Sequence, residues 1–162
     1  RTAAAISEAA VLLTRPVDRL LHRLFWFLQG SDVLARLSPA SLPIIASDWA
    51  HATDPRRRHD GALLCLIRAQ TWDPALRYEL RWTQALDYWQ RLLAADTFWD
   101  HFAAIETAGA FTPAADPDLL QQFRRQAMDF VLDYLVKTIE CAQTVNDRPL
   151  IERGRRIIRA LR

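Results

Sequence analysis

Apolar residues recur along two long stretches of the chain with the spacing of one helix face. Within 75–95 they follow i, i+3, i+4, i+7 spacing at Trp82, Ala85, Leu86, Trp89, Leu92 and Leu93. Within 117–144 the same spacing holds for Leu119, Leu120, Phe123, Ala127, Phe130, Val131, Tyr134, Leu135 and Ile139. A period near 3.6 residues is typical of amphipathic helices that bury one face. The pattern therefore predicts helices over 75–95 and 117–144.

A polar residue followed by proline recurs along the chain, as Ser-Pro at 38–39 and Asp-Pro at 54–55, 73–74 and 116–117. The Ser or Asp side chain accepts backbone N–H groups that lack a partner at a helix start, and proline suits the first helical position. Gly30 and Gly109 indicate helix ends, and 108–116 reads as a loop. Eight helices are predicted, over 2–13, 16–28, 31–37, 39–52, 55–72, 75–95, 97–108 and 117–144, with a basic ninth at 149–161.

The length and composition favour one helical domain. The chain has 162 residues with only four glycines, and no alternating strand pattern of useful length is present. Short links between amphipathic helices make neighbours pack antiparallel. We expect an all-α domain over 1–162, built of stacked antiparallel helical hairpins. It would comprise an N-terminal helical pair (1–30), a helical-repeat core (31–108) and C-terminal helices (117–162). Because the first residue is not Met, we expect the domain to come from a longer chain.

Three of the six tryptophans cluster in "RWTQALDYWQRLLAADTFWDHF", residues 81–102. They could fill a seam between helices, or form a surface that grips a partner. The Ala85–Trp89 spacing favours the seam, because tetratricopeptide-type repeats place a small residue four positions before an aromatic one. We therefore expect a tetratricopeptide-like, right-handed array. On the second interpretation Trp82, Tyr88 and Trp99 would contact a partner on a concave face.

Two segments resemble the helical region that follows a J-like domain in certain large bacterial proteins. The first is "RPVDRLLHRLFWF", with matching residues Pro16, Arg19, Leu20, Leu24, Phe25, Trp26 and Phe27. The second carries Trp82, Ala85, Leu86, Tyr88, Trp89, Phe98 and Trp99. The resemblance covers about residues 10 to 105 and implies a scaffold or chaperone-associated adaptor, not a catalyst. The chain lacks the His-Pro-Asp tripeptide with which a J domain stimulates its Hsp70 partner.

The basic residues are almost all arginine. Lys137 is the only lysine among 21 basic residues, and the net charge is +2. So small a net charge does not by itself indicate nucleic acid. The segment "IERGRRIIRALR" interleaves arginines with apolar residues. This pattern is typical of a helix that packs its apolar side on the domain and exposes its arginines to solvent, or of a basic helix that binds an acidic membrane or nucleic acid. Its candidate partner-binding residues are Arg155, Arg156 and Arg159.

The sequence predicts no catalytic residue, cofactor or metal site. Residues 47–60 offer Asp48, His51, Asp54, His59 and Asp60, but the histidines lack metal-ligand spacing and straddle a predicted helix break. We expect a solvated turn there, with Arg56–Arg58 balancing the carboxylates. The adjacent Asp100 and His101 point about 100° apart on a helix and cannot converge on one substrate. Glycine-rich phosphate loops and G-x-S-x-G elbows are absent.

Two isolated cysteines, Cys65 and Cys141, lie in apolar helical patterns and are expected to be buried, reduced thiols of a cytoplasmic protein. No apolar stretch approaches the length of a membrane span. The expected function is therefore a protein–protein interaction scaffold or adaptor in a larger bacterial assembly, whose partner is another protein or another domain of the parent chain. The alternatives are a nucleic-acid-binding domain using the arginines of 55–58 and 153–162, and an enzyme of unrecognised type.

Overall fold

All regular secondary structure in the described residues is α-helical. The computed structural model describes residues 15–28, 41–70, 78–107, 116–144 and 148–160. Its helices are α2 (Pro16–Leu24), α3 (Leu42–Ala50), α4 (Pro55–Gln70), α5 (Tyr78–Ala94), α6 (Asp96–Thr107), α7 (Pro117–Thr144) and α8 (Arg148–Ala160). The all-α prediction is confirmed for this part of the chain. The helices predicted at 2–13 and 31–37, and the helix starts at 38–39 and 73–74, lie outside it.

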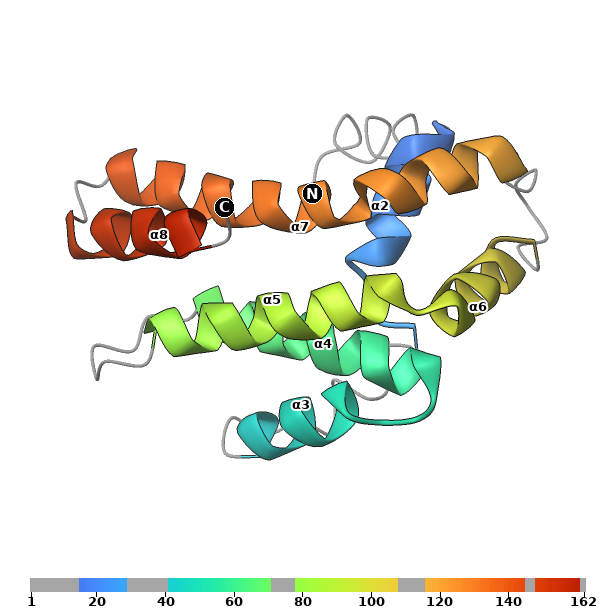
Figure 1. Ribbon diagram of the computed structural model, residues 1–162, viewed down its shortest axis with the longest axis horizontal. Helices are drawn as coiled ribbons and strands as arrows, with labels where there is room; N and C mark the ends of the chain where they lie inside the picture. The colour runs from blue at the N-terminus through green and yellow to red at the C-terminus, as the bar shows by residue number, and fades with distance from the viewer. Residues whose placement is uncertain (1–14, 29–40, 71–77, 108–115, 145–147, 161–162) are drawn as a thin grey trace, which may run out of the picture.

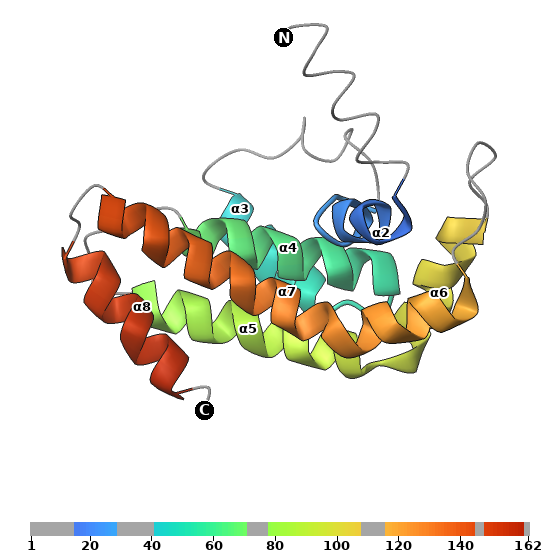
Figure 2. The same cartoon turned by 90° about the horizontal axis from the view of Figure 1, so that it is seen from above.

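From α3 to α6 and from α7 to α8, helices that follow each other in the chain pack together (Figure 1). Helix α3 packs on α4 and α4 packs on α5, while α6 continues from the end of α5 after a bend. The long helix α7 runs across α5, and α8 folds back along α7 and also contacts α5. Helix α2 crosses α7 near the α6 end of the molecule (Figure 2). None of the described helices is both long and apolar enough to cross a lipid bilayer.

Two of the predicted helix starts have the expected chemistry. Asp54 Oδ1 accepts the N–H of Arg56 at 2.9 Å, one residue beyond Pro55. Asp116 Oδ1 accepts the N–H of Asp118 at 3.1 Å in the same way. Each side chain satisfies a donor that has no partner inside the helix. The predicted bounds of α7, 117–144, match the structure, and those of α6 and α8 differ by one residue.

The tryptophans of residues 81–102 lie in the core. Trp82, Trp89 and Trp99 are all buried, and Ala85 is fully buried beside them on α5. Trp99 donates its indole N–H to the Leu93 carbonyl at 2.8 Å across the α5–α6 bend. The seam interpretation is confirmed, because these side chains do not form an exposed surface.

Helices α3 and α4 approach closely through small residues. A Cβ placed on Gly61 would lie 2.2 Å from the backbone nitrogen of Ala50, closer than any real contact. On the same faces, the buried thiol of Cys65 lies 3.7 Å from the Ala46 carbonyl oxygen. Glycine is therefore required at position 61 for the α3 backbone to reach α4.

His59 and Asp60 are fully buried, so the prediction of a solvated turn at 47–60 is wrong for these two residues. His59 Nε2 lies 2.8 Å from the Leu24 carbonyl oxygen, and Nδ1 lies 3.0 Å from Asp60 Oδ1. The same Oδ1 accepts the N–H of Leu28 at 2.8 Å. Each ring nitrogen of His59 therefore faces an oxygen atom within hydrogen-bond distance.

This pair explains why α2 ends at Leu24, four residues before the predicted end at 28. In a continuing helix, the N–H of Leu28 would donate to the carbonyl of Leu24. Here that carbonyl accepts from His59 and that N–H donates to Asp60. The sequence pattern of α2 does not contain this information, because the two partners lie on α4.

We expect Trp89→Ala to lower the free energy of unfolding by about 3–5 kcal/mol, because it removes a large buried side chain. The variant also loses ring contacts with Phe25 and His59, whose centroids lie 5.9 and 5.6 Å from that of Trp89. Urea unfolding measures the change. The matched control is Trp26→Ala, since Trp26 is 54% exposed, and it should cost less than about 1 kcal/mol. Similar losses in both variants would contradict the seam assignment.

We expect Asp60→Asn to lower the free energy of unfolding by about 3–5 kcal/mol, because it removes one charge of a buried, hydrogen-bonded pair. Asp87→Asn is the control: Asp87 pairs with Arg91 at 2.8 Å on the surface, and its loss should cost less than about 1 kcal/mol. Urea unfolding of both variants is the measurement. A cost for Asp60→Asn no larger than that of the control would show that the buried pair does not hold α2.

Candidate functional site

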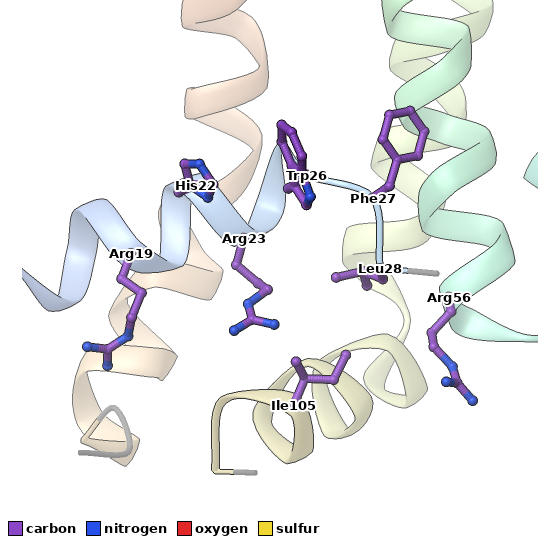
Figure 3. A pocket seen from close by; sticks show the side chains of 8 residues that line it. All are labelled: Arg19, His22, Arg23, Trp26, Phe27, Leu28, Arg56 and Ile105. Carbon is purple, nitrogen blue, oxygen red and sulfur yellow. The ribbon is translucent and has the colours of Figure 1, made fainter. Parts of the chain in front are cut away.

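A cavity of about 490 Å³ opens beside α2 and is lined mainly by basic and apolar side chains. Figure 3 shows it from close by. We call it the basic pocket, defined by Arg19, His22, Arg23, Trp26, Phe27, Leu28, Arg56 and Ile105. No carboxylate lines it among the described residues, although Asp54 lies nearby, 3.9 Å from Arg56 Nε. The lining therefore presents positive charge above an apolar floor.

Helix α2 and the segment directly after it supply most of the polar lining, through two pairs of residues four positions apart. Arg19 and Arg23 are four residues apart and extend to the same side of the helix in Figure 3. His22 and Trp26 form the second pair, with ring centroids 5.7 Å apart and planes inclined by only 19°. The i, i+4 spacing places Arg19 and Arg23 on one face of α2, and Trp26 stacks on His22 from just beyond the end of the helix. The opposite face of α2 buries Leu20 and Leu24 in the core, which orients the two arginines outward.

The wall after α2 is fixed by the buried His59–Asp60 pair. The bond from the Leu28 N–H to Asp60 and the bond at the Leu24 carbonyl hold the two ends of residues 24–28. Between them Phe27 is buried, whereas Trp26 is exposed. This short segment therefore has a defined conformation that turns Trp26 outward and the next residue, Phe27, inward.

Two other helices complete the basic pocket. Arg56 comes from the first turn of α4 and approaches from the side opposite Arg19 and Arg23, and Ile105 of α6 lies between them in Figure 3. The three guanidinium groups are therefore distributed around the cavity and do not converge on one point. Such an arrangement suits a ligand with several separated anionic groups.

A second cavity, of about 290 Å³, lies between α2 and α7 and differs in charge. Phe25 and Tyr134 stack across it with centroids 5.8 Å apart. Its charged residues, Asp133 and Lys137, pair with each other at 2.7 Å.

The six residues that the sequence suggested for partner binding do not form one surface. Trp82, Tyr88 and Trp99 are buried. In contrast, Arg155, Arg156 and Arg159 lie on the exposed face of α8, whose Ile157 is buried. The basic helix is therefore docked, with Arg155, Arg156 and Arg159 exposed to solvent.

The histidines at 51 and 59 do not share a site. His51 is exposed and its Nδ1 lies 2.8 Å from the Ser47 carbonyl oxygen, while both nitrogens of His59 are engaged inside the core. Within the described ranges, no group of three or more His, Cys, Asp or Glu side chains is placed to hold a metal ion. At the other candidate, Asp100 is exposed and His101 is half-buried.

The two cysteines are free and differ in environment, so the expectation of two buried thiols is wrong for Cys141, which is exposed. Burial raises the pKa of Cys65 from 9.0 to about 11, although the charge of Arg68 opposes this shift. The thiolate is the reactive form, so Cys65 stays protonated and inert at neutral pH.

We expect iodoacetamide at about pH 8 to label Cys141 in the folded protein and to leave Cys65 unmodified. A raised pKa suppresses the thiolate at every pH below it, so labelling of Cys65 should begin only as unfolding exposes it. Mass spectrometry of peptides from native and urea-unfolded protein provides the measurement. Equal labelling of both thiols in native protein would contradict the burial of Cys65.

Only some of the residues that line the basic pocket could be predicted from the sequence to lie close together. The i, i+4 spacing of Arg19 with Arg23 and of His22 with Trp26 is visible in the sequence, and it was the available signal. The approach of Arg56 and Ile105 depends on tertiary packing. Chemically, the pocket can bind anions and an apolar group together. In comparisons with protein-family models, curated proteins and solved structures, nothing matched this chain.

Proposed function

We propose that the protein is a scaffold or adaptor module that binds another protein, or another domain of its parent chain, in the basic pocket. The observation that carries this proposal is Trp26, which is 54% exposed at the pocket while Trp82 and Trp89 are fully buried. Exposed indole adds nothing to the core, and tryptophan beside arginine is the composition of binding hot spots at protein interfaces.

The chemistry of the lining favours binding over catalysis. The described residues of the basic pocket carry no carboxylate, thiol or hydroxyl side chain. The lining therefore lacks a side-chain nucleophile such as Ser or Cys, and His22 lacks an orienting carboxylate within the pocket. We therefore assign the pocket a recognition role and no catalytic residue.

We also propose a tetratricopeptide-like array as the architecture and a bacterial, cytoplasmic, chaperone-associated assembly as the setting. The sequential packing of α3 on α4 and of α4 on α5, and the α7–α8 hairpin, support stacked hairpins. The segment 16–27, which resembles the region after a J-like domain, supplies Arg19, Trp26 and Phe27 to the basic pocket. The resemblance and the pocket therefore share these three residues.

The proposal is tested by selecting displayed random peptides of about 12 residues on the immobilised full chain. We expect an enriched peptide family that binds in fluorescence anisotropy with micromolar affinity and loses about 10-fold or more with Trp26→Ala. The matched control is Ile44→Ala, because Ile44 is 65% exposed on α3 and does not line the pocket. Its binding should change less than about 2-fold, and both variants are first checked for folding by thermal unfolding.

Two results would contradict the proposal. One is the absence of any enriched family whose binding depends on Trp26. The other is submicromolar binding of single- or double-stranded oligonucleotides that falls by two to three decades between about 50 and 200 mM salt. If neutralising Arg155, Arg156 and Arg159 abolished that binding, the nucleic-acid alternative would replace the proposal.

A further inference from the structure

The contacts of the buried His59–Asp60 pair require one proton beyond those of a neutral imidazole and a carboxylate. His59 Nε2 faces the Leu24 carbonyl oxygen at 2.8 Å, and Nδ1 faces Asp60 Oδ1 at 3.0 Å. Both contacts are hydrogen bonds only when one hydrogen lies on Nε2 and another lies between Nδ1 and Oδ1. A neutral imidazole carries only one hydrogen on its nitrogens. The pair therefore holds a second one, on the ring or on the carboxyl group.

Loss of this proton to solvent changes which bonds can form. The remaining ring hydrogen is favoured at Nδ1, which faces the carboxylate charge, so the lone pair of Nε2 then faces the Leu24 carbonyl oxygen. That contact is repulsive, and it leaves a buried acceptor without a donor. The N–H of Leu28 can replace the lost donor, because it lies four residues further along the chain, at the spacing of an α-helical hydrogen bond. Each acceptor then again has one donor.

We propose that the His59–Asp60 pair is a proton-dependent switch that sets where α2 ends. With the proton bound, α2 ends at Leu24 and the N–H of Leu28 donates to Asp60. Without it, the N–H of Leu28 pairs with the Leu24 carbonyl and α2 extends to residue 28. The sequence is compatible with the longer helix, since it predicts one over 16–28. Trp26 lies inside the segment that changes, so the switch also redirects the exposed indole of the basic pocket.

The surroundings of His59 direct the change toward α2. The ring stacks on Phe98 of α6, with centroids 5.7 Å apart and planes inclined by 5°, and it meets Trp89 of α5 edge-on. All three side chains are buried. Because close-packed aromatic rings leave the imidazole little freedom to turn, the repulsion at Nε2 is relieved more easily by movement of the segment after α2. Protonation of a buried histidine can in this way bias an element that has two arrangements.

Three other ionisable side chains lie close to the switch along the chain or beside the segment that it moves. Arg56 and Arg58 precede His59 on α4, and arginine keeps its charge at every pH at which the protein is folded. His22 of α2 stacks on Trp26 and can itself gain or lose a proton near neutral pH. The test must therefore separate His22 from His59.

The test is an NMR titration of the isotope-labelled full chain from about pH 6 to about pH 9, which covers the upper part of the range in which histidines change charge. Nitrogen-15 signals show whether His59 Nε2 carries hydrogen, and carbon-13 signals of the Cα atoms report the backbone of residues 25–28. We expect Nε2 to carry hydrogen at about pH 6 and to lose it as the pH rises. With the same midpoint, the Cα signals of residues 25–28 should shift toward helical values.

Two variants locate the proton. His22→Gln should leave the titration of residues 25–28 unchanged. Asp60→Asn, which cannot share a proton, should show the high-pH signals of residues 25–28 already at about pH 6. If Asp60→Asn does not fold, the titration of the unmodified chain and of His22→Gln decides the proposal.

Four results would overturn the proposal. They are a bare His59 Nε2 at about pH 6, a hydrogen retained on it up to about pH 9, its loss without any shift at residues 25–28, and disappearance of the response in His22→Gln.

Discussion

The end of α2 and the packing around it depend on the replacement of one backbone hydrogen bond, between Leu24 and Leu28, by bonds to side chains of α4. The carbonyl of Leu24 and the N–H of Leu28 would pair if α2 continued, but His59 and Asp60 take their places as partners. The two inserted side chains also bond to each other, so the gap in the helix is filled by a continuous chain of three hydrogen bonds. Because all four groups lie away from solvent or in half-buried positions, each would be costly to leave without a partner.

The aromatic core is arranged around the same point. The His59 ring stacks on Phe98 of α6, with planes inclined by 5°, and meets Trp89 of α5 edge-on. Phe98 in turn contacts Trp99 and Phe102, and Phe102 stacks on Phe123 of α7. Aromatic contacts therefore extend from the α2–α4 junction through α6 to α7. A change at the pair is transmitted to the packing of several helices, since interiors are close-packed and deform little.

The sequence contains most of the information for the helices but little of that for the pocket. Periodicity and the Asp-Pro starts at 54–55 and 116–117 depend on neighbours a few residues apart, and they predict α4 and α7 well. The end of α2 was missed because its determinants, His59 and Asp60, are 32 to 35 residues away. The sequence predicts a solvated turn at 47–60 because polar residues are usually exposed, but a hydrogen-bonded buried pair overrides that tendency at His59 and Asp60. The burial of the tryptophans was predictable, because the Ala85–Trp89 spacing that indicates a helix seam lies within one helix.

The buried pair matters more for conformation than for net stability. Replacing a buried ion pair by well-packed apolar residues is often neutral or stabilising, so such a pair is weak evidence of stabilisation. Its specific consequence here is that residues 25–28 leave the helix at a fixed point, with Phe27 directed to the core and Trp26 to solvent. Had α2 continued to residue 28, the indole would have kept its helical direction and the N–H of Leu28 would not have turned toward α4. Because residues 24–28 already have a fixed conformation, this side of the pocket loses less conformational entropy when a ligand binds. The same interaction that ends α2 therefore also preorganises the basic pocket.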